Sequence, residues 1–196
     1  MKIKSYLIVI FLYLITTNNL YAIDPEIFVQ STVNRASKIL SEDISKEKKM
    51  LELQKIAKDT VDIKGIGFYT LGSIRKNLNE DQKNEYENLF EKYFLKSFSS
   101  RLAEYTNPEI DVLGKEVLSE KYTIVNSLLK ATNERPEIKI DWRIYTKDAG
   151  NPLIRDLIIE GLSLARTQKE EFSSIINSND GDIKALFKVL EDFSNN

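Results

Sequence analysis

The sequence predicts an α+β protein in which several helices pack against a curved antiparallel sheet of about four strands. Apolar residues recur every three or four positions over 24–106, then at every second position from 109 to 163, and helical spacing returns after 164. The short connections between the expected strands favour antiparallel neighbours. We therefore expect a single domain over 23–196, helical over 24–106, with strands over 109–163 and C-terminal helices over 164–193.

The N-terminal part carries several helix boundary signals. Asp24 and Pro25 combine a capping carboxylate with a residue suited to the first helical turn. A second helix is expected over about 46–59. Asp62 to Gly72 predicts a short helix with a cap at one end and a glycine stop at the other. Its Gly65 and Gly67 indicate close packing, or a lining that leaves space, and we favour close packing.

The clearest predicted element is a long helix of about 26 residues that starts after Asn79. Asn79 and Gln82 have the spacing of a capping box, and Asn107-Pro108 ends the pattern. Aromatic and aliphatic residues recur along one side of this helix. Such a stripe suits either a packed core or the wall of an apolar cavity. It comprises Tyr86, Leu89, Phe90, Tyr93, Phe94, Phe98, Leu102 and Tyr105.

Four strands are expected, over 109–118, 122–131, 137–147 and 153–163. The third alternates best, with Ile138, Ile140, Trp142 and Ile144 on one face. The fourth is apolar on both faces, which favours a strand covered on both sides. Gly161 within it indicates a bulge, a bend or a close backbone approach. A helix should start after the fourth strand at Ser163, and a last helix is expected over about 182–193.

The composition excludes most catalytic chemistry. The chain has no Cys and no His, which removes disulfides, thiolates, imidazole ligands and the commonest general base. Asp156 and Glu160 lie four residues apart, about 13 Å along a strand, which is wider than the roughly 5–9.5 Å between paired glycosidase carboxylates. No spacing of residues matches a metal loop or a phosphate loop. We therefore expect no catalytic residue, no metal ligand and no cofactor.

The first 22 residues have the pattern of a secretory signal peptide. Lys2 and Lys4 precede an apolar run from Tyr6 to Ile15, and Leu20-Tyr21-Ala22 resembles a cleavage site. The run is too short to span a bilayer core of about 30 Å. Removal of 1–22 would leave 26 basic and 30 acidic residues, a net charge of −4. An exported acidic protein is a poor candidate for binding nucleic acid.

The segment from Asp156 to Leu164, followed by Phe172, resembles the signature of the MlaC family, also called toluene-tolerance or ABC-transporter auxiliary proteins. The 62–72 segment, the long helix and the central strands also resemble family patterns, in the same order. The chain departs from those patterns just after Gly72, near Pro152 and over 167–172. The resemblance thus covers most of the chain after the signal peptide.

The resemblance implies an NTF2-like sheet with added helices that enclose an apolar cavity. It implies a monomeric periplasmic carrier of phospholipid, with lipid as cargo and no enzymatic activity. Such carriers maintain outer-membrane lipid asymmetry by exchanging lipid with an outer-membrane lipoprotein–porin complex and an inner-membrane ABC transporter complex. Two alternatives remain: an exported interaction protein with a filled core and no ligand, or a small cavity enzyme with a carboxylate or Tyr acid–base.

Nine residues are candidates for the cavity wall, because they are apolar and lie on predicted helices or strands that would face one another. For each of them, ordinary core packing is an equally good interpretation. The candidates are Ile66, Phe68, Phe94, Phe98, Val125, Leu129, Ile140, Trp142 and Ile158.

Overall fold

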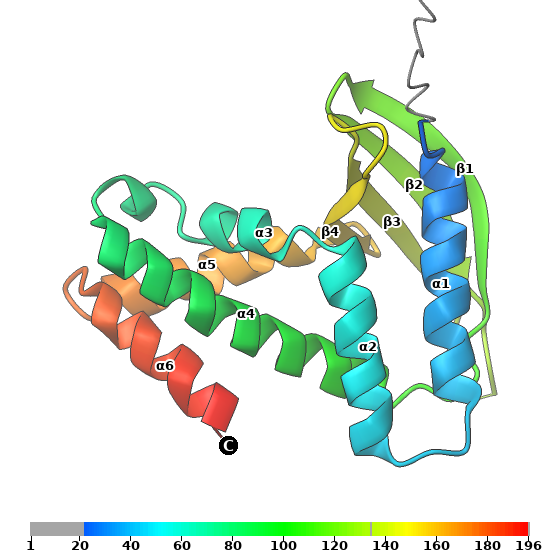
Figure 1. Cartoon of the computed structure of the whole chain (residues 1–196), viewed down its shortest axis with the longest axis horizontal. Coiled ribbons are helices and arrows are strands. Elements are labelled where there is room, and N and C mark those ends of the chain that lie inside the picture. The colour runs from blue at the N-terminus through cyan, green and yellow to red at the C-terminus, as the bar shows by residue number, and fades with distance from the viewer. Residues whose placement is uncertain (1–21, 134, 196) are drawn as a thin grey trace, which may run out of the picture.

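The computed structural model describes residues 22–133 and 135–195 (Figure 1). The predicted signal peptide therefore lies almost wholly outside the described residues. Among the described residues, no helix is long and apolar enough to cross a membrane. The elements in order are α1 (Pro25–Ser41), α2 (Lys46–Thr60), α3 (Ile63–Thr70), the 3₁₀ helix η1 (Ile74–Lys76), α4 (Glu80–Leu102), β1 (Ile110–Ser119), β2 (Tyr122–Leu129), β3 (Ile138–Tyr145), β4 (Leu153–Ile159), β5 (Leu162–Ser163), α5 (Leu164–Asn177) and α6 (Ile183–Asn195).

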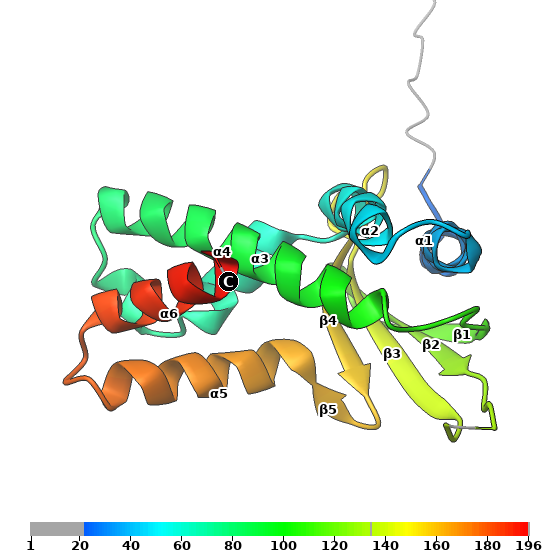
Figure 2. The same cartoon turned by 90° about the horizontal axis from the view of Figure 1, so that it is seen from below.

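The molecule has two halves that sit side by side (Figures 1 and 2). The sheet half consists of α1, α2 and a five-stranded antiparallel sheet in the order β1-β2-β3-β4-β5. The helical half consists of α3, η1, α5, α6 and the first part of α4. The C-terminal part of α4 reaches into the sheet half, on the same side of the sheet as α1 and α2 (Figure 2). The α+β prediction, with helices packed against an antiparallel sheet, is thereby confirmed.

The predicted helix starts are all present. The Asp24 carboxylate accepts a hydrogen bond from the backbone N–H of Glu26 at 2.8 Å, and Asp62 caps α3 in the same manner. Asn79 and Gln82 form the complete capping box. These caps satisfy backbone N–H groups that have no acceptor within the first helical turn. The helix boundaries therefore follow local chemistry that the sequence displays.

The sheet has an inner face and an outer face. Val125 of β2 is paired with Trp142 of β3, which is paired with Leu157 of β4, so these three side chains share one face. Lys115 of β1 is also paired with Val125, and its ammonium contacts Asp24 at the start of α1. The face that carries Val125 therefore lies toward α1, and we call it the inner face.

The prediction of one continuous strand over 153–163 was wrong. Glu160 and Gly161 have φ angles of +49° and +83°, and they form a two-residue turn between β4 and β5. Two successive positive φ angles are typical of the tight hairpin turn whose twist matches antiparallel strands, and glycine adopts them without steric cost. The segment is therefore a short hairpin that leads into α5, and Gly161 makes its turn.

Gly65 and Gly67 are close-packing residues, as we favoured from the sequence. A Cβ on Gly67 would lie 2.8 Å from Cδ1 of Phe90 on α4. A Cβ on Gly65 would lie 2.6 Å from both the Asp62 carboxylate and the Arg155 guanidinium, which form an ion pair. Both distances are shorter than van der Waals contact, so the two glycines let α3 approach α4 and the sheet.

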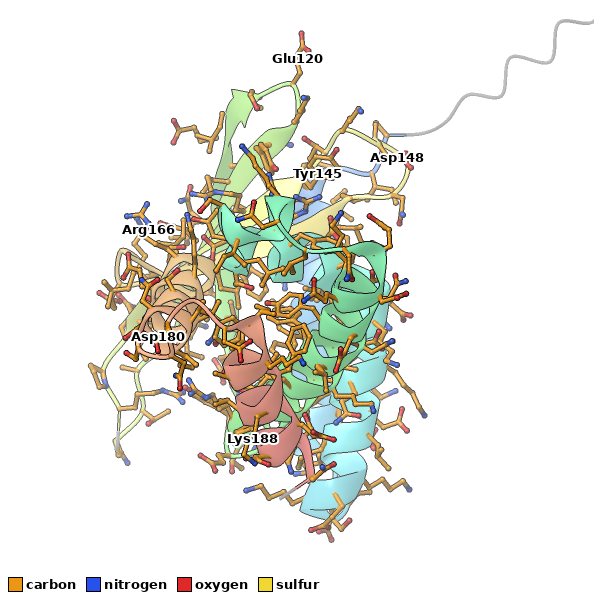
Figure 3. The ribbon with its side chains drawn as sticks, turned by 90° about the vertical axis from the view of Figure 1, so that its left-hand side faces the viewer. Glu120, Tyr145, Asp148, Arg166, Asp180 and Lys188 are labelled. Carbon is orange, nitrogen blue, oxygen red and sulfur yellow. The ribbon has the colours of Figure 1, made fainter. Side chains whose placement is uncertain are left out.

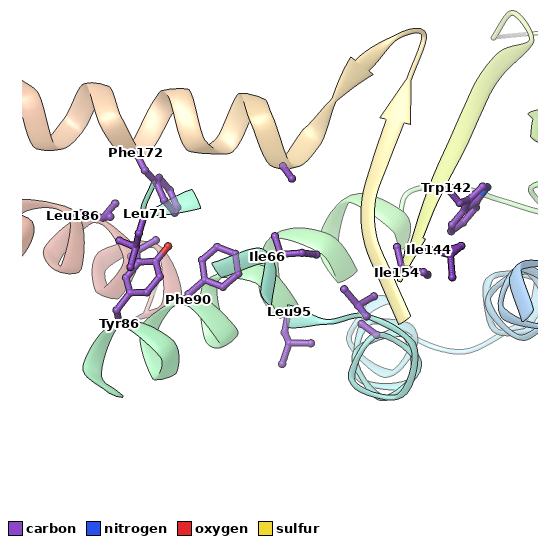
Figure 4. Packing of buried hydrophobic residues seen from close by; sticks show 14 of the residues in the cluster. Ile66, Leu71, Tyr86, Phe90, Leu95, Trp142, Ile144, Ile154, Phe172 and Leu186 are labelled. Atoms are coloured by element: carbon purple, nitrogen blue, oxygen red, sulfur yellow. The ribbon is translucent and has the colours of Figure 1, made fainter. Parts of the chain in front are cut away.

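The helical half has a tightly packed aromatic core (Figure 4). The rings of Phe90 and Phe172 meet edge to face, with centroids 6.2 Å apart, and both side chains are 2% exposed. Tyr86 stacks on Phe90 and shares a 2.7 Å hydrogen bond with the hydroxyl of Thr70. Burial raises the pKa of Tyr86, so the phenol stays neutral. This core leaves its aromatic side chains almost no contact with solvent.

Candidate functional site

The inner face of the sheet brings together four of the nine predicted cavity residues. Val125, Leu129, Ile140 and Trp142 all project from it, and all four are buried. Ile66 of α3 is also buried and lies between the helical core and the inner-face residues (Figure 4). These residues belong to one continuous hydrophobic core that spans both halves.

Phe94 and Phe98 approach the sheet half from α4. Their rings stack with centroids 5.7 Å apart and an interplanar angle of 9°. Both are only partly buried, although they pack against the core. By contrast, Phe90, one turn earlier on α4, is buried. The aromatic side chains of α4 are thus buried near Phe90 and become partly exposed toward the C-terminal end of the helix.

Two predicted residues are not brought into this group. Phe68 lies in the helical half, where it lines a small pocket of about 30 Å³ between α3 and α4. Ile158 is paired with Asp141 and therefore projects from the outer face of the sheet. The register shifts between the Arg143–Asp156 and Ile144–Ile154 pairs, which leaves Arg155 as an extra residue. Such a β-bulge reverses the alternation of side chains, so Leu157 takes the inner position.

A band of partly buried apolar side chains lies on α4, on the segment after it and on the inner face of the sheet. Sequence reasoning did not propose its four aliphatic members as cavity residues. Alternation in β1 and β3 places three of them, Ile110, Val112 and Ile138, on the inner face, whereas Leu157 of β4 reaches that face through the bulge. Large apolar groups that remain partly exposed can bind further apolar surface. This apolar band comprises Phe94, Phe98, Tyr105, Ile110, Val112, Ile138 and Leu157.

The polar groups on the inner face are satisfied within the protein. The indole N–H of Trp142 donates to the Ser127 hydroxyl at 2.8 Å, and that hydroxyl donates to the carbonyl of Ile140 at 3.0 Å. Lys115 at the β1 edge contacts Asp24 and Glu26. Because these groups already have partners, the inner face presents mainly apolar surface to anything that approaches it.

The most buried carboxylate has a structural role. Asp156 accepts hydrogen bonds from the Ser163 hydroxyl at 2.6 Å and the Ala165 backbone N–H at 3.0 Å, and its other contact is Arg143 at 3.4 Å. Asp156 thereby attaches the first turn of α5 to β4. Glu160 accepts instead from the backbone of Lys139. The two acids of the C-terminal signature thus hold the hairpin and the helix in place.

Within the described residues, no group of three or more His, Cys, Asp or Glu residues could hold a metal ion. A second depression, of about 740 Å³ and widely open, lies between Tyr69 and the polar side of α5 from Arg166 to Ser178. None of the nine predicted cavity residues lines it. Arg166 projects from the molecular surface there (Figure 3).

A family model described as MlaC protein matches residues 30–192. The chain belongs to the MlaC family. Its fold is similar to that of a phospholipid-binding protein from Ralstonia solanacearum, solved in complex with a phospholipid, with a TM-score of 0.74 and 17% sequence identity. That similarity covers 88% of this chain and 97% of the other. A search of curated proteins finds no match. MlaC membership and the shared fold agree with the resemblance seen in the sequence.

Proposed function

We propose that this MlaC-family protein is a periplasmic phospholipid carrier that holds acyl chains against the apolar band, between α4 and the inner face of the sheet. The observation that carries this proposal is the partial exposure of Phe94, Phe98 and Leu157 beside a closed core. Family membership and the fold shared with a phospholipid-binding protein support it. Four of the nine predicted residues, Val125, Leu129, Ile140 and Trp142, form the floor beneath the acyl chains.

The physical need for such a carrier is large. Each buried CH₂ contributes about 0.8 kcal/mol, so a chain of roughly 15 methylenes meets a barrier of about 12 kcal/mol to free transfer through water. A carrier lowers this barrier by offering apolar surface for the tails while the head group stays near water. The apolar band provides such a surface without a carboxylate or an amine in it. A chemically inert wall suits cargo that must be released unchanged.

The cellular role follows from the same proposal. Residues 1–22 direct export, and the mature chain acts as one monomeric domain in the periplasm. It exchanges lipid with an outer-membrane lipoprotein–porin complex and an inner-membrane ABC transporter complex, and so maintains the lipid asymmetry of the outer membrane. No cofactor takes part, since lipid is the cargo.

The deciding experiment is mass spectrometry of the mature protein purified from the periplasm without detergent, intact and after solvent extraction. We expect stoichiometric diacyl phospholipid, chemically unchanged. Folded protein without lipid, still lipid-free after incubation with phospholipid vesicles, would favour the interaction-protein alternative. Recovery of lysophospholipid or free fatty acid from added phospholipid would favour the enzyme alternative.

A matched pair of variants locates the site. Phe98→Asp places a carboxylate in the apolar band, and burying an unpaired charge beside an acyl chain is costly. Leu51→Asp makes the same change on α2, where Leu51 is 58% exposed and lies outside the band. We expect Phe98→Asp to lose bound lipid and Leu51→Asp to retain it. Equal lipid content in the two folded variants would contradict the proposed position.

A further inference from the structure

Arg135 lies in the connection between β2 and β3, close to one end of the apolar band. Its guanidinium carbon is 4.8 Å from the centroid of the Tyr105 ring, and Tyr105 is a member of the band. The connection joins the ends of two strands at the paired residues Leu129 and Ile138, both on the inner face. A cation is therefore positioned beside an otherwise apolar surface.

The guanidinium of Arg135 is not fully hydrogen-bonded within the described part of the chain. Its Nε is buried, and it is the one buried side-chain nitrogen or oxygen of the described residues without a hydrogen-bond partner. Those residues also provide no carboxylate within ion-pair distance of it. A buried donor without an acceptor costs free energy, so such a group calls for an explanation.

The neighbouring cations are engaged elsewhere. Lys130 contacts Glu109 at 3.3 Å and Asp111 at 3.4 Å, and Lys46 contacts Glu104 at 3.4 Å. The Arg135 backbone is held by paired hydrogen bonds with Thr132, at 2.8 and 3.4 Å. Stacking on Tyr105 further restricts the guanidinium plane. Arg135 is thus a pre-positioned cation for which the described residues provide no ion-pair partner.

We propose that Arg135 binds the phosphodiester of the carried lipid, an inference that rests on the proposed function. A ligand with tails on the apolar band would carry its anionic group at an end of that band, and Arg135 lies at such an end. The planar guanidinium can donate two parallel hydrogen bonds to phosphate oxygens. The head group thereby lies at the β2–β3 end of the sheet, and Arg135 selects lipids that bear a phosphate.

Native mass spectrometry of delipidated protein tests this proposal by competition between phosphatidylglycerol and diacylglycerol with identical tails. The wild type should prefer the phospholipid by about tenfold or more, as expected for a charge-assisted hydrogen bond. R135Q should lose most of that preference while it keeps its binding of diacylglycerol. R135K retains the positive charge but cannot donate two parallel hydrogen bonds. Its preference for phosphatidylglycerol over diacylglycerol should be intermediate. R166Q removes an exposed arginine on α5 and should behave as the wild type.

The outcomes separate the two proposals. Wild-type protein that binds neither lipid refutes the carrier function itself. Wild-type protein that binds phosphatidylglycerol, with the same lipid preference in folded R135Q and R135K, leaves the carrier function intact and refutes the role of Arg135. An excess of inorganic phosphate should not displace phosphatidylglycerol, since it lacks tails. Displacement by inorganic phosphate would instead assign Arg135 to a free anion.

Discussion

Helix α4 runs through both halves of the molecule, and its phenylalanine side chains are more buried in the helical half than in the sheet half. Phe90 is buried in the helical half, whereas Phe94 and Phe98, one and two turns later, keep partial exposure beside the sheet. The helical half buries the Phe90 ring, whereas the sheet half leaves part of the Phe94 and Phe98 rings exposed. One half therefore maintains the fold, and the other presents surface that a ligand can cover.

Removal of a large side chain from the closed half should have the largest effect on stability. Phe172→Ala deletes a ring that is 2% exposed and contacts Phe90 and Tyr93. We expect the free energy of unfolding to fall by about 3–5 kcal/mol, because the cavity cannot collapse fully. Urea denaturation followed by circular dichroism measures this change. A loss below about 1 kcal/mol would show that the helical core is looser than its burial indicates.

A methyl group added to a glycine should destabilise the protein where the glycine is tightly packed and have little effect where it faces open space. Gly67→Ala brings a Cβ to 2.8 Å from the Phe90 ring, whose own packing prevents a simple shift. We expect a destabilisation of about 1–3 kcal/mol, as for overpacked cores. Gly114→Ala in β1 is the control, since its Cβ would have no neighbour within 4 Å. The control should be neutral or slightly stabilising, and equal losses in both variants would contradict this explanation.

The same truncation in the apolar band should cost less stability and affect ligand binding more. We expect Phe98→Ala to lower the free energy of unfolding by about 1 kcal/mol, since its ring is only partly removed from water. Its retention of phospholipid should fall clearly below that of the wild type in native mass spectra. A stability loss as large as that of Phe172→Ala, with lipid content unchanged, would remove the distinction between the halves.

The smallest expected effect concerns pH at the junction of α1 and β1. The hydrogen bond from Lys115, followed by that from the Glu26 backbone N–H, lowers the pKa of Asp24. A carboxyl group with a lowered folded-state pKa stabilises the protein above its unfolded pKa, and the effect is lost as the pH falls below about 4. Asp24→Asn should therefore lose less stability than the wild type between about pH 7 and 3. Identical acid dependence of the two melting temperatures would show that Asp24 contributes nothing.

Much of the fold could be predicted because the determining interactions are local. The caps at Asp24, Asn79 and Ser163 need partners only two or three residues away, and β3 alternates regularly. The errors arose where the backbone departs from regular geometry. The Glu160–Gly161 turn converted one expected strand into a hairpin.

The candidate site was harder to predict because it depends on long-range register. The bulge at Arg155 placed Leu157, rather than Ile158, on the inner face. The contact between Arg135 and Tyr105 joins the β2–β3 connection to the segment that follows α4. No pattern within a short window of sequence could have indicated that contact.

The bulged residue Arg155 also has a consequence for the order of folding. Its guanidinium binds Asp62, a residue 93 positions earlier, and the Asp62 backbone N–H donates to the carbonyl of Ile154. Contacts between residues so far apart in sequence form late, because a long loop must close first. The N-terminal helices therefore cannot complete their packing until β4 has been synthesised. A growing chain with this arrangement stays incompletely folded for most of its synthesis.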